Sequence, residues 1–586
     1  MSDKAIQLVQ DSFDRAYTVQ SPRNDIYLRA WQRYKGYNPN ISDPYKTNIV
    51  MPKLYSTIET ITPRLGKALF GRRPYIPIKN DKVPDAVEPI ELALDEYLHR
   101  DGFKVTGKRA LKCIALFGTA FLEPYPAQVI EIEKKMMISP EYPWQPITVE
   151  EKTRKFALKT RLWMPWQVYV EPNMKDINDC GWVITIDVVS KEQIRKMQEI
   201  GRFKRGELKN LSDAGGESES KTNFAKTMIQ GLGISAPTVN ENYGILMRWM
   251  SDDRYVTTWN GLQILEDRDN PYKHQKKNIV KFAYNEDPML QNSFWGQGEG
   301  KTLEAICDKL DETWNQAFNN HDLINEAVFG YREDAVNPDT IVMVGGVRIP
   351  IASGFSGDLK NALQKFDIQG LPADFYQIPG VLDMWADRAS GVFDIQRGEP
   401  DDEDGKTATE ASLLNSQGDI RSEERVELLE AMGMRDFADK ALSHIDQFTT
   451  FDDIYDIVGD EALNLVTMNP QELPGSSDYQ FKGSDSIVND FQKAAEAREM
   501  LETLGQSPVM RPGWNERNFL QSKGFTDKEI DEAVFTDEEL MMQQQQQMMM
   551  QQQQADQEFE RDMVKTKMGA APAKKAKVPT VQNPGG

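Results

Sequence analysis

Two short stretches of the sequence combine residue types that could bind phosphate groups. Residues 294–302 read FWGQGEGKT, and residues 405–407 read GKT. A phosphate-binding loop has the pattern G-x-x-x-x-G-K-[ST], in which backbone N–H groups surround the phosphates and the lysine supplies positive charge. If either stretch were such a loop, the chain would be a nucleotide-dependent motor, an ATPase or a GTPase.

Both stretches depart from this pattern. In the first, Trp295 stands where the leading glycine is required, and Glu299 places a carboxylate where phosphate oxygens would lie. In the second, Pro400 stands at the glycine position, and four acidic residues precede Gly405. We interpret FWGQGEGKT instead as a turn that begins a long helix, with glycines that give the backbone freedom. Glu299 then suits the positive end of the helix dipole, and Lys301 is a surface charge.

The acidic stretch EPDDEDGK, residues 399–406, is a candidate calcium loop. If Gly405 is the sixth residue of an EF-hand loop, Asp402 and Asp404 fall at the third and fifth ligand positions. The first and twelfth positions are then Pro400 and Ala411, which carry no carboxylate. A solvated acidic loop is the better interpretation, and weak divalent-ion binding is the alternative.

Histidine and cysteine do not point to an enzyme or a metal centre. The histidines lie in different segments, and none stands at metal-ligand spacing or in a Cys–His or Ser–His–Asp context. The cysteines match no disulfide framework or zinc pattern, which is typical of a reducing, cytoplasmic compartment. We therefore expect no catalytic residue, no cofactor and no metal. The residues concerned are His99, His274, His321, His444, Cys113, Cys180 and Cys307.

The composition is that of a soluble globular protein, with 39% hydrophobic and 27% charged residues among 586. No apolar run approaches the ~20 residues that span a bilayer. The net charge of −22 argues against a tight, sequence-independent DNA binder, because phosphate contacts need clustered Lys and Arg. Residues 1–80 nevertheless carry 13 Lys and Arg against 6 Asp and Glu, a balance of +7. This uneven distribution of charge predicts surfaces that bind different partners. The alternative is random variation of charge over a solvated surface.

Hydrophobic periodicity predicts helices over residues 1–36, 52–70 and 88–117, the first of them ended by Gly36. Alternating residues between 121 and 290 predict strands, with a short helix at 191–200. The Ser/Gly-rich residues of about 205–240 are expected to form a mobile loop or insertion.

The region from 295 to 450 is the most informative. An apolar stripe from Leu303 to Leu323 predicts a helix of about 20 residues, because its period is 3.6 residues. Gly345-Gly346 predicts a two-residue hairpin within residues 340–351. A further helix follows from Gly380, and its apolar residues are expected on one face: Val381, Leu382, Trp385, Ala389, Val392 and Phe393.

A long helical stretch should then run to about Phe448. Thr407 and Glu410 stand in capping-box spacing at its start, and Gly418 and Gly433 are candidate kinks. Tryptophans on these stripes and strands are expected in the core or between subunits. Towards the end, residues 541–554 read MMQQQQQMMMQQQQ, and they predict either a helix or a low-complexity disordered tail.

Between 290 and 450 the order is a glycine-containing turn, a long helix, a small hairpin module, a second helix, an acidic loop, TATE and a very long helix. This order resembles the portal (head-to-tail connector) proteins of tailed bacteriophages. GKTATEASLLN is similar to a TATE-type element of podovirus portals, while ALFGTAFLEPY and MPWQVYVEPNMKDINDCGWVI resemble the preceding wing segments. The resemblance covers most of residues 25–450.

The resemblance implies an α+β, mainly helical fold with wing, stem, clip and crown regions. Residues 1–298 would form the N-terminal wing and residues 407–450 its long helix. The other implied regions are a first stem helix at 299–325, the clip at 326–379, a second stem helix at 380–398, a tunnel loop at 399–406, a crown-like helical region at 451–540 and the Gln/Met-rich end at 541–586.

The resemblance also implies a structural function without catalysis. Portal subunits form a ring, usually of twelve copies, at one capsid vertex, and double-stranded DNA passes through its channel during packaging and ejection without sequence specificity. The implied partners are the terminase large subunit at the clip, then tail or adaptor proteins, and the major capsid and scaffolding proteins. The implied location is the virion, after assembly in the host cytoplasm.

Three sets of candidate site residues follow. Acidic loops repeated around a ring would repel the duplex and keep it centred. The tunnel-loop set is Glu399, Asp401, Asp402, Glu403, Asp404 and Lys406; Arg388 and Arg397 are candidate lumen contacts with DNA; and Arg332, Glu333, Asp334 and Arg348 are candidate docking residues of the clip. The alternative functions are the nucleotide-dependent motor and an unrelated oligomeric scaffold.

Overall fold

The computed structural model describes residues 2–38, 46–79, 87–138, 146–199, 203, 243–286, 294–325, 329–336, 351, 358, 363–365, 369–392, 420–459 and 480–481. The chain divides into two compact units, residues 1–484 and 485–586, and every described residue belongs to the first. Several expectations lie outside the described residues: the 205–240 insertion, the Gly345-Gly346 hairpin, the capping box at Thr407, the kink at Gly418 and the Gln/Met-rich end.

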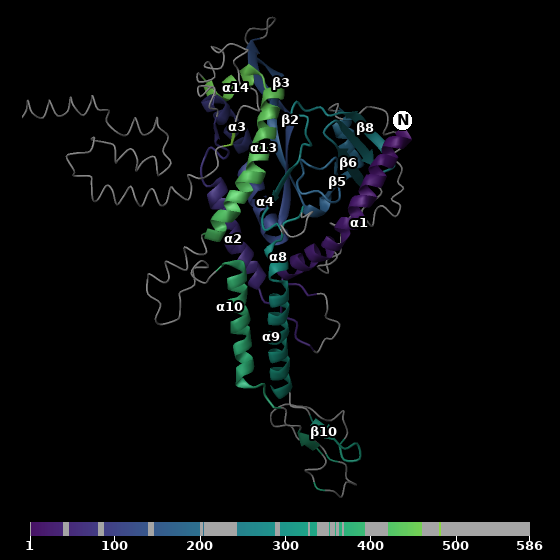
Figure 1. Cartoon of the computed structure of the whole chain (residues 1–586), viewed down its shortest axis with the longest axis vertical. Coiled ribbons are helices and arrows are strands. Elements are labelled where there is room, and N and C mark those ends of the chain that lie inside the picture. The colour runs from purple at the N-terminus through teal and green to yellow at the C-terminus, as the bar shows by residue number, and fades with distance from the viewer. Residues whose placement is uncertain are drawn as a thin grey trace, which may run out of the picture. The chain divides into compact units, whose positions relative to one another are not determined.

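The chain has an α+β fold in which helices are the larger part of the described secondary structure (Figure 1). The helices are α1 (Ser2–Tyr34), α2 (Lys53–Phe70), α3 (Val87–Asp101), α4 (Phe103–Phe117), α5 (Lys191–Glu199), α8 (Glu299–Thr302), α9 (Glu304–Asn325), α10 (Ile378–Ser390), α13 (Arg435–Phe448) and α14 (Phe451–Val458). Short 3-10 turns occupy Pro165–Gln167 and Ala373–Gln377. The predicted helices at 1–36, 52–70 and 191–200 are confirmed as α1, α2 and α5.

All strand pairs of the described residues are antiparallel. The strands are β1 (Ile78–Lys79), β2 (Thr119–Ile138), β3 (Pro146–Trp163), β4 (Val168–Val170), β5 (Val183–Ser190), β6 (Tyr243–Met250), β7 (Arg254–Trp259), β8 (Gln263–Asp269), β9 (Val280–Ala283), β10 (Phe329–Tyr331), β11 (Leu363–Lys365) and β12 (Gln480–Phe481). The two larger sheets have the orders β3-β2-β9 and β4-β5-β6-β7-β8, while β1 pairs with β12 and β10 with β11.

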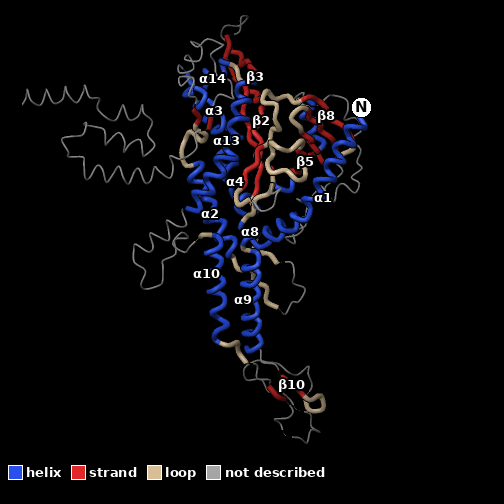
Figure 2. Tube along the Cα trace, in the orientation of Figure 1, coloured by secondary structure: helices blue, strands red, loops and turns tan. Residues whose placement is uncertain are grey.

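Helix α1 covers one face of the five-stranded sheet (Figure 2). Its apolar residues Ala5, Val9, Phe13 and Ala16 recur every three or four residues, so they form one stripe. The Phe13 ring meets the Tyr169 ring edge to face, with 4.9 Å between their centroids. Gly36 ends the helix region with a φ of 68°, as the sequence predicts.

The three-stranded sheet lies in the largest hydrophobic core, together with α2, α4 and α13. Strand β3 pairs along its whole length with β2, from Phe121 opposite Trp163 to Ile138 opposite Pro146. Only the first part of β2, Thr119–Leu122, also pairs with β9. This short three-stranded part therefore connects the long β2–β3 ribbon to the loop that precedes α8.

The single helix predicted over 88–117 is wrong, because α3 and α4 are separate helices. Gly102 separates them with a φ of 74°, a left-handed conformation that glycine adopts readily. The periodicity continues across the break because Leu98 and Phe103 are both fully buried in the same core. Periodicity therefore identified the buried face and missed the change in direction.

The long helix predicted to reach Phe448 is described from residue 420. It is α-helical over 420–428, passes through a π-helical turn at Leu429–Met434 and continues as α13. Gly433, a predicted kink, lies in the π-helical turn against β9. A Cβ atom there would lie 2.3 Å from a Phe282 ring carbon, so close approach requires a glycine.

Candidate functional site at the base of the helix pair

Helices α9 and α10 lie side by side and extend away from the sheets (Figures 1 and 2). We call them the helix pair, and we call the end that carries the start of α9 and the end of α10 its base. The helix predicted from the apolar stripe between Leu303 and Leu323 is confirmed as α9, and the short helix α8 precedes it, so residues 299–325 form two helices that are separated at Leu303. The helix predicted at 380–398 is wrong at its end, because α10 stops at Ser390. Gly391 has a φ of 73°, and its N–H donates to the Asp387 carbonyl.

The glycines of FWGQGEGKT are packing residues at this base. The expectation that they supply backbone freedom is wrong, because none of them has a positive φ. A Cβ atom at Gly296 would lie 2.4 Å from the Gly118 carbonyl oxygen, and one at Gly298 would lie 2.5 Å from the Leu116 oxygen. At Gly300 it would lie 2.6 Å from the Ala30 Cβ. The loop is therefore pressed between α1 and the end of α4.

Four backbone N–H groups of this loop donate to protein acceptors. Gly296 N–H donates to Thr119 Oγ1 at 2.9 Å, and Gln297 N–H donates to the Asn285 carbonyl at 3.1 Å. The N–H groups of Lys301 and Thr302 both donate to the Gly298 carbonyl. A phosphate loop presents such groups to its ligand, so this arrangement favours the structural interpretation.

Glu299 is the first residue of α8, at the positive end of a helix as predicted, but its side chain is buried and only 1% exposed. Its Oε1 accepts a hydrogen bond from Arg425 at 2.6 Å, and the Arg425 guanidinium lies 5.0 Å from the centre of the Tyr284 ring. Burial raises the pKa of Glu299, and the attraction of Arg425 opposes that shift. Lys301 is a surface charge as predicted, half exposed and paired with Glu304 at 2.6 Å.

Basic residues from the N-terminal part hold the acidic base of the pair. Arg29 contacts Glu304 at 2.7 Å, and Arg33 contacts both Glu304 and Asp308. Lys53, itself buried, lies 2.6 Å from Asp383 and 2.8 Å from Asp387. Part of the charge asymmetry noted in residues 1–80 is thus used within the chain.

An extended segment at residues 46–51 runs along α9 through a polar ladder. The N–H groups of Met51, Ile49 and Thr47 donate to the side chains of Asp311, Asn315 and Asn319, at 2.7, 2.8 and 2.7 Å respectively. Asn315 also donates to the Ile49 carbonyl at 3.0 Å, so it pairs with both backbone groups of that residue. Burial raises the pKa of Asp311 to about 6. No pattern in the sequence indicates this contact.

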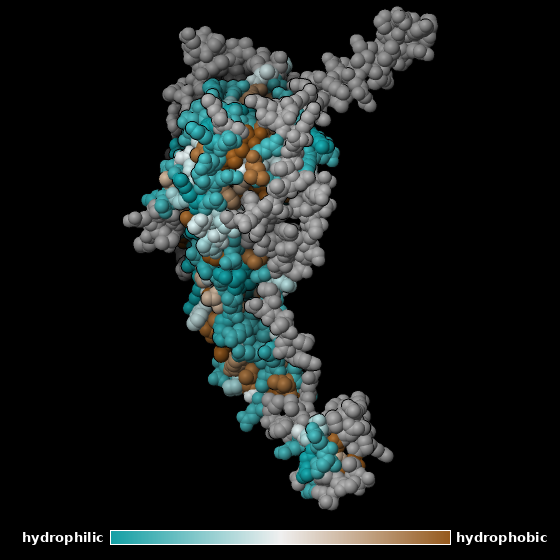
Figure 3. All heavy atoms as spheres, turned by 90° about the vertical axis from the view of Figure 1, so that its right-hand side faces the viewer, coloured by the Kyte–Doolittle hydropathy of each residue, from teal (hydrophilic) through white to brown (hydrophobic). Residues whose placement is uncertain are grey.

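Beyond the base, both helices carry large apolar side chains on exposed surfaces. Figure 3 shows hydrophobic side chains gathered on the part of the helix pair that lies away from the sheets. Trp385 is 52% exposed, although Leu382 on the same helix is buried. The predicted single apolar face of α10 is therefore two faces. The exposed residues are Phe318, Leu323 and Ile324 on α9, and Ile378, Val381, Met384 and Trp385 on α10.

The structure describes some of the sequence-predicted site residues. Arg332 and Asp334 form an exposed ion pair at 2.7 Å just after β10, with Glu333 exposed between them. Arg388 is exposed near the end of α10, and its carbonyl accepts a hydrogen bond from Arg421. The remaining candidates lie outside the described residues: Arg348, Arg397, Glu399, Asp401, Asp402, Glu403, Asp404 and Lys406.

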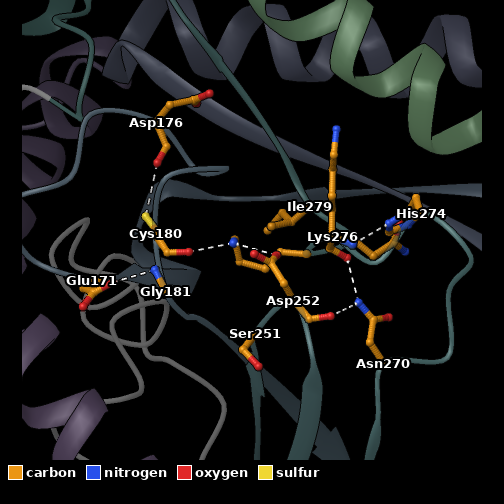
Figure 4. Close-up of polar contacts among 12 residues, drawn as sticks. Glu171, Asp176, Cys180, Gly181, Ser251, Asp252, Asn270, His274, Lys276 and Ile279 are labelled. Carbon is orange, nitrogen blue, oxygen red and sulfur yellow. Dashed lines mark hydrogen bonds and ion pairs between the residues drawn. The ribbon is translucent and has the colours of Figure 1, made fainter. Parts of the chain in front are cut away.

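Two histidines that lie 170 residues apart in the sequence come together in a buried polar cluster. The ring centroids of His274 and His444 are 5.5 Å apart. His444 Nε2 lies 2.9 Å from Asn278 Oδ1 and 3.1 Å from the Pro124 carbonyl, so this nitrogen carries the proton. His274 Nδ1 accepts from the Lys276 N–H (Figure 4). Burial lowers the pKa of His274 to about 4 and that of His444 to about 3.

The same cluster contains a fully buried lysine between the two larger sheets. Lys277 donates to the Cys180 carbonyl at 2.6 Å and lies 2.9 Å from Asp252 Oδ1. Asn270 donates to the backbone carbonyls of Asp252 and Lys276, as Figure 4 shows. These contacts connect the 171–181 loop to the β6–β7 turn, so the cluster is structural.

Within the described residues, no group of three His, Cys, Asp or Glu side chains is arranged to hold a metal ion. The three cysteines are free and buried, and burial raises the pKa of the Cys180 and Cys307 thiols to about 12. No helix in the described segments combines the length and the apolar character that crossing a lipid bilayer requires.

No protein-family model and no curated protein sequence matches this chain. The interpretation of the site therefore depends on its own geometry. The tight, charged base and the exposed apolar surfaces of the helix pair are its most distinctive features.

Proposed function

We propose that this chain is a subunit of a homo-oligomeric ring of the portal type, and that the helix pair supplies contacts between neighbouring copies. The observation that carries this proposal is the set of exposed apolar side chains on α9 and α10. Large apolar side chains gathered on one region mark interaction sites, because exposing them to water is unfavourable.

The placement of these side chains favours a closed ring over an isolated chain. Trp385 and Val381 lie on α10, whereas Phe318 and Leu323 lie on the other helix. A contact between the α10 surface of one copy and the α9 surface of the next joins two different patches. Such a heterologous contact generates a ring when its rotation closes.

The order of elements supports the portal assignment within this class. A long helix, a small antiparallel pair of strands and a returning helix follow one another as α9, β10–β11 and α10. In the proposal the helix pair is the stem, residues 326–379 are the clip that docks the terminase and later tail or adaptor proteins, and the ring occupies one capsid vertex. Double-stranded DNA then passes through the channel, and the chain has no catalytic role.

The test is the mass and shape of the purified full-length protein, by mass photometry and negative-stain microscopy at several salt concentrations. We expect a large ring with an axial hole, of about twelve subunits. The double variant Val381→Glu and Trp385→Glu should reduce the particle to smaller species. Leu262→Glu is the matched control, because Leu262 is equally exposed but lies between β7 and β8.

A strictly monomeric or dimeric wild-type particle under all conditions would sink the proposal. Measurement of ATP and GTP binding, with Lys301→Ala as the variant, addresses the nucleotide-dependent motor. Nucleotide hydrolysis that is lost in this variant would replace the ring proposal with the motor.

A further inference from the structure

Two arginines on one helix contact α10 and α8, the short helix that leads into α9. Arg421 and Arg425 stand four residues apart within residues 420–428, so they lie on the same side of that helix, one turn apart. One contacts the end of α10, and the other contacts the beginning of α8. No sequence motif indicated this arrangement.

Arg421 holds the last turn of α10. Its Nη1 donates to the Arg388 carbonyl at 3.0 Å and to the Ala389 carbonyl at 3.4 Å. These carbonyls have no partner within their own helix, and the negative end of the helix dipole attracts a cation. A Cβ atom at Gly391 would lie 2.9 Å from the Arg421 side chain, so the cap and the arginine fit closely.

Arg425 holds the beginning of α8, which directly precedes α9. It pairs with Glu299, the first residue of α8, inside the protein and against Tyr284. Val426 is the other buried residue of the described part of this helix before Leu429. The arginine contacts are therefore a large part of what fixes residues 420–428 in place.

The rotation of this helix about its axis is set by the π-helical turn that follows it. Leu429 and Met434, the first and last residues of the turn, are buried, and Gly433 is pressed against Phe282. After the turn, α13 is anchored by Lys440, which donates to the Ile279 carbonyl at 2.7 Å, and by His444. A π-helical turn holds one residue more than the corresponding α-helical turn.

We propose that residues 420–428 act as a clamp whose two arginines engage and release α10 and α8, the short helix that leads into α9, together, with the π-helical turn setting the engaged position. If the turn lost its extra residue, the helix before it would rotate by about 100°, the angle per residue of an α-helix. Both arginines would then leave their partners at once. The clamp makes the position of α8–α9 and the position of α10 depend on each other, whether or not the chain forms a ring.

Hydrogen–deuterium exchange of the full-length protein, read by peptide mass spectrometry, tests the coupling. Arg421→Ala and Arg425→Ala are each expected to speed exchange in both 299–310 and 378–392, by about tenfold or more, the factor that corresponds to about 1.4 kcal/mol of local opening. Exchange in β5–β8 should stay unchanged. Arg435→Ala is the matched control, because Arg435 is exposed on the same long helix after the turn.

Deletion of Met432, an exposed residue of the π-helical turn, provides the second measurement. It should speed exchange at both ends of the clamp together. If this deletion also speeds exchange in β5–β8, the result of the test is taken from the exchange of Arg421→Ala and Arg425→Ala. The proposal is overturned if each arginine variant affects only the helix that its own side chain contacts, or if the folded deletion variant leaves either end unchanged.

Discussion

The base of the helix pair and the surfaces beyond it are built in different ways. At the base, Gly296 and Gly298 touch neighbouring backbone, and the Glu299 carboxylate is buried with a guanidinium. Farther along, Phe318 and Trp385 face outward with no comparable packing among the described residues. The base is closely packed and rich in charge, whereas the outer surfaces are apolar and exposed.

This difference indicates that two parts of the helix pair meet two different physical requirements. Charged groups in a packed environment fix direction and spacing, because each needs a partner at a defined position. Apolar surface specifies contact without a fixed orientation, because burial of its area is favourable in any geometry that excludes water. The base is therefore suited to holding the pair in one setting, and the outer surfaces to association with another surface.

The largest expected effect is at the base. Gly118 has a φ of 92°, and a Cβ atom there would lie 2.1 Å from the Gly296 carbonyl oxygen. We expect Gly118→Val to lower the free energy of unfolding by about 3 kcal/mol or more, from overpacking and a strained backbone. Urea unfolding followed by circular dichroism measures the loss.

Gly380→Ala is the control for this variant, because no atom lies within 4 Å of its added Cβ and the residue is helical. Alanine there should be neutral or stabilising by up to about 1 kcal/mol. Similar losses of unfolding free energy in Gly118→Val and Gly380→Ala would contradict the conclusion that the base is tightly packed.

The second effect concerns the buried ion pair. Arg425→Met leaves Glu299 without its cation, and removal of one partner of a buried pair costs about 3–5 kcal/mol. We expect a loss near the lower end of this range at pH 7, because burial already raises the pKa of Glu299 and so reduces the cost of neutralising the unpaired carboxylate. The added variant Glu299→Gln should recover part of the loss.

Lys301→Met is the comparison, because Lys301 forms an exposed pair with Glu304 at the same end of the helix. Exposed pairs contribute about 1 kcal/mol or less. Equal losses in Arg425→Met and Lys301→Met would show that burial of the first pair has no energetic consequence.

The third effect separates the two faces of α10. Leu382 is 8% exposed and Val381 is 42% exposed, although they are adjacent. Leu382→Ala should lower the free energy of unfolding by about 2 kcal/mol, as in other large-to-small core changes. Val381→Ala should change it by less than about 0.5 kcal/mol, as is usual at surfaces. Comparable losses in the two variants would remove the distinction between the faces.

The smallest effect on stability at neutral pH is expected for the pair His274 and His444, and this effect becomes larger as the pH falls. Both pKa values are lowered from the ordinary 6.5, so the unfolded chain binds protons more readily than the folded one. Stability is therefore fully present above about pH 6.5 and falls progressively towards the folded values of about 4 and 3. His444→Gln should flatten the fall in melting temperature between pH 6.5 and pH 4. An unchanged pH profile would contradict this account.

Much of the helical framework can be predicted from the sequence, because amphipathic periodicity reports which face of a helix is buried. Helices α1, α2 and α9 follow from it directly. The break at Gly102 does not, since Leu98 and Phe103 continue the pattern on both sides of it. Periodicity also placed Val381 and Leu382 on one face, although among the described residues Leu382 is buried and Val381 is exposed.

The base of the helix pair was located by its glycines, but its chemistry was not predicted. The glycines are required by close approach to Gly118, Leu116 and Ala30, which lie far away in the sequence, and the partner of Glu299 is Arg425. The histidine pair depends on a contact across 170 residues. No local pattern reports such contacts, because they depend on how the sheets and α13 pack together.

The polar ladder between α9 and residues 46–51 limits how that helix can move. Four residues of helix rise about 6.0 Å, and two residues of an extended chain span about 6.6 Å, so successive side chains meet alternate N–H groups. A slide of α9 along the segment would have to proceed in whole steps of four residues. One step in either direction would place Cys307 or Leu323 at the end of the ladder, and neither offers a comparable oxygen acceptor. The ladder thus fixes the position of α9 along residues 46–51. While these hydrogen bonds are formed, α9 cannot slide gradually along its own axis.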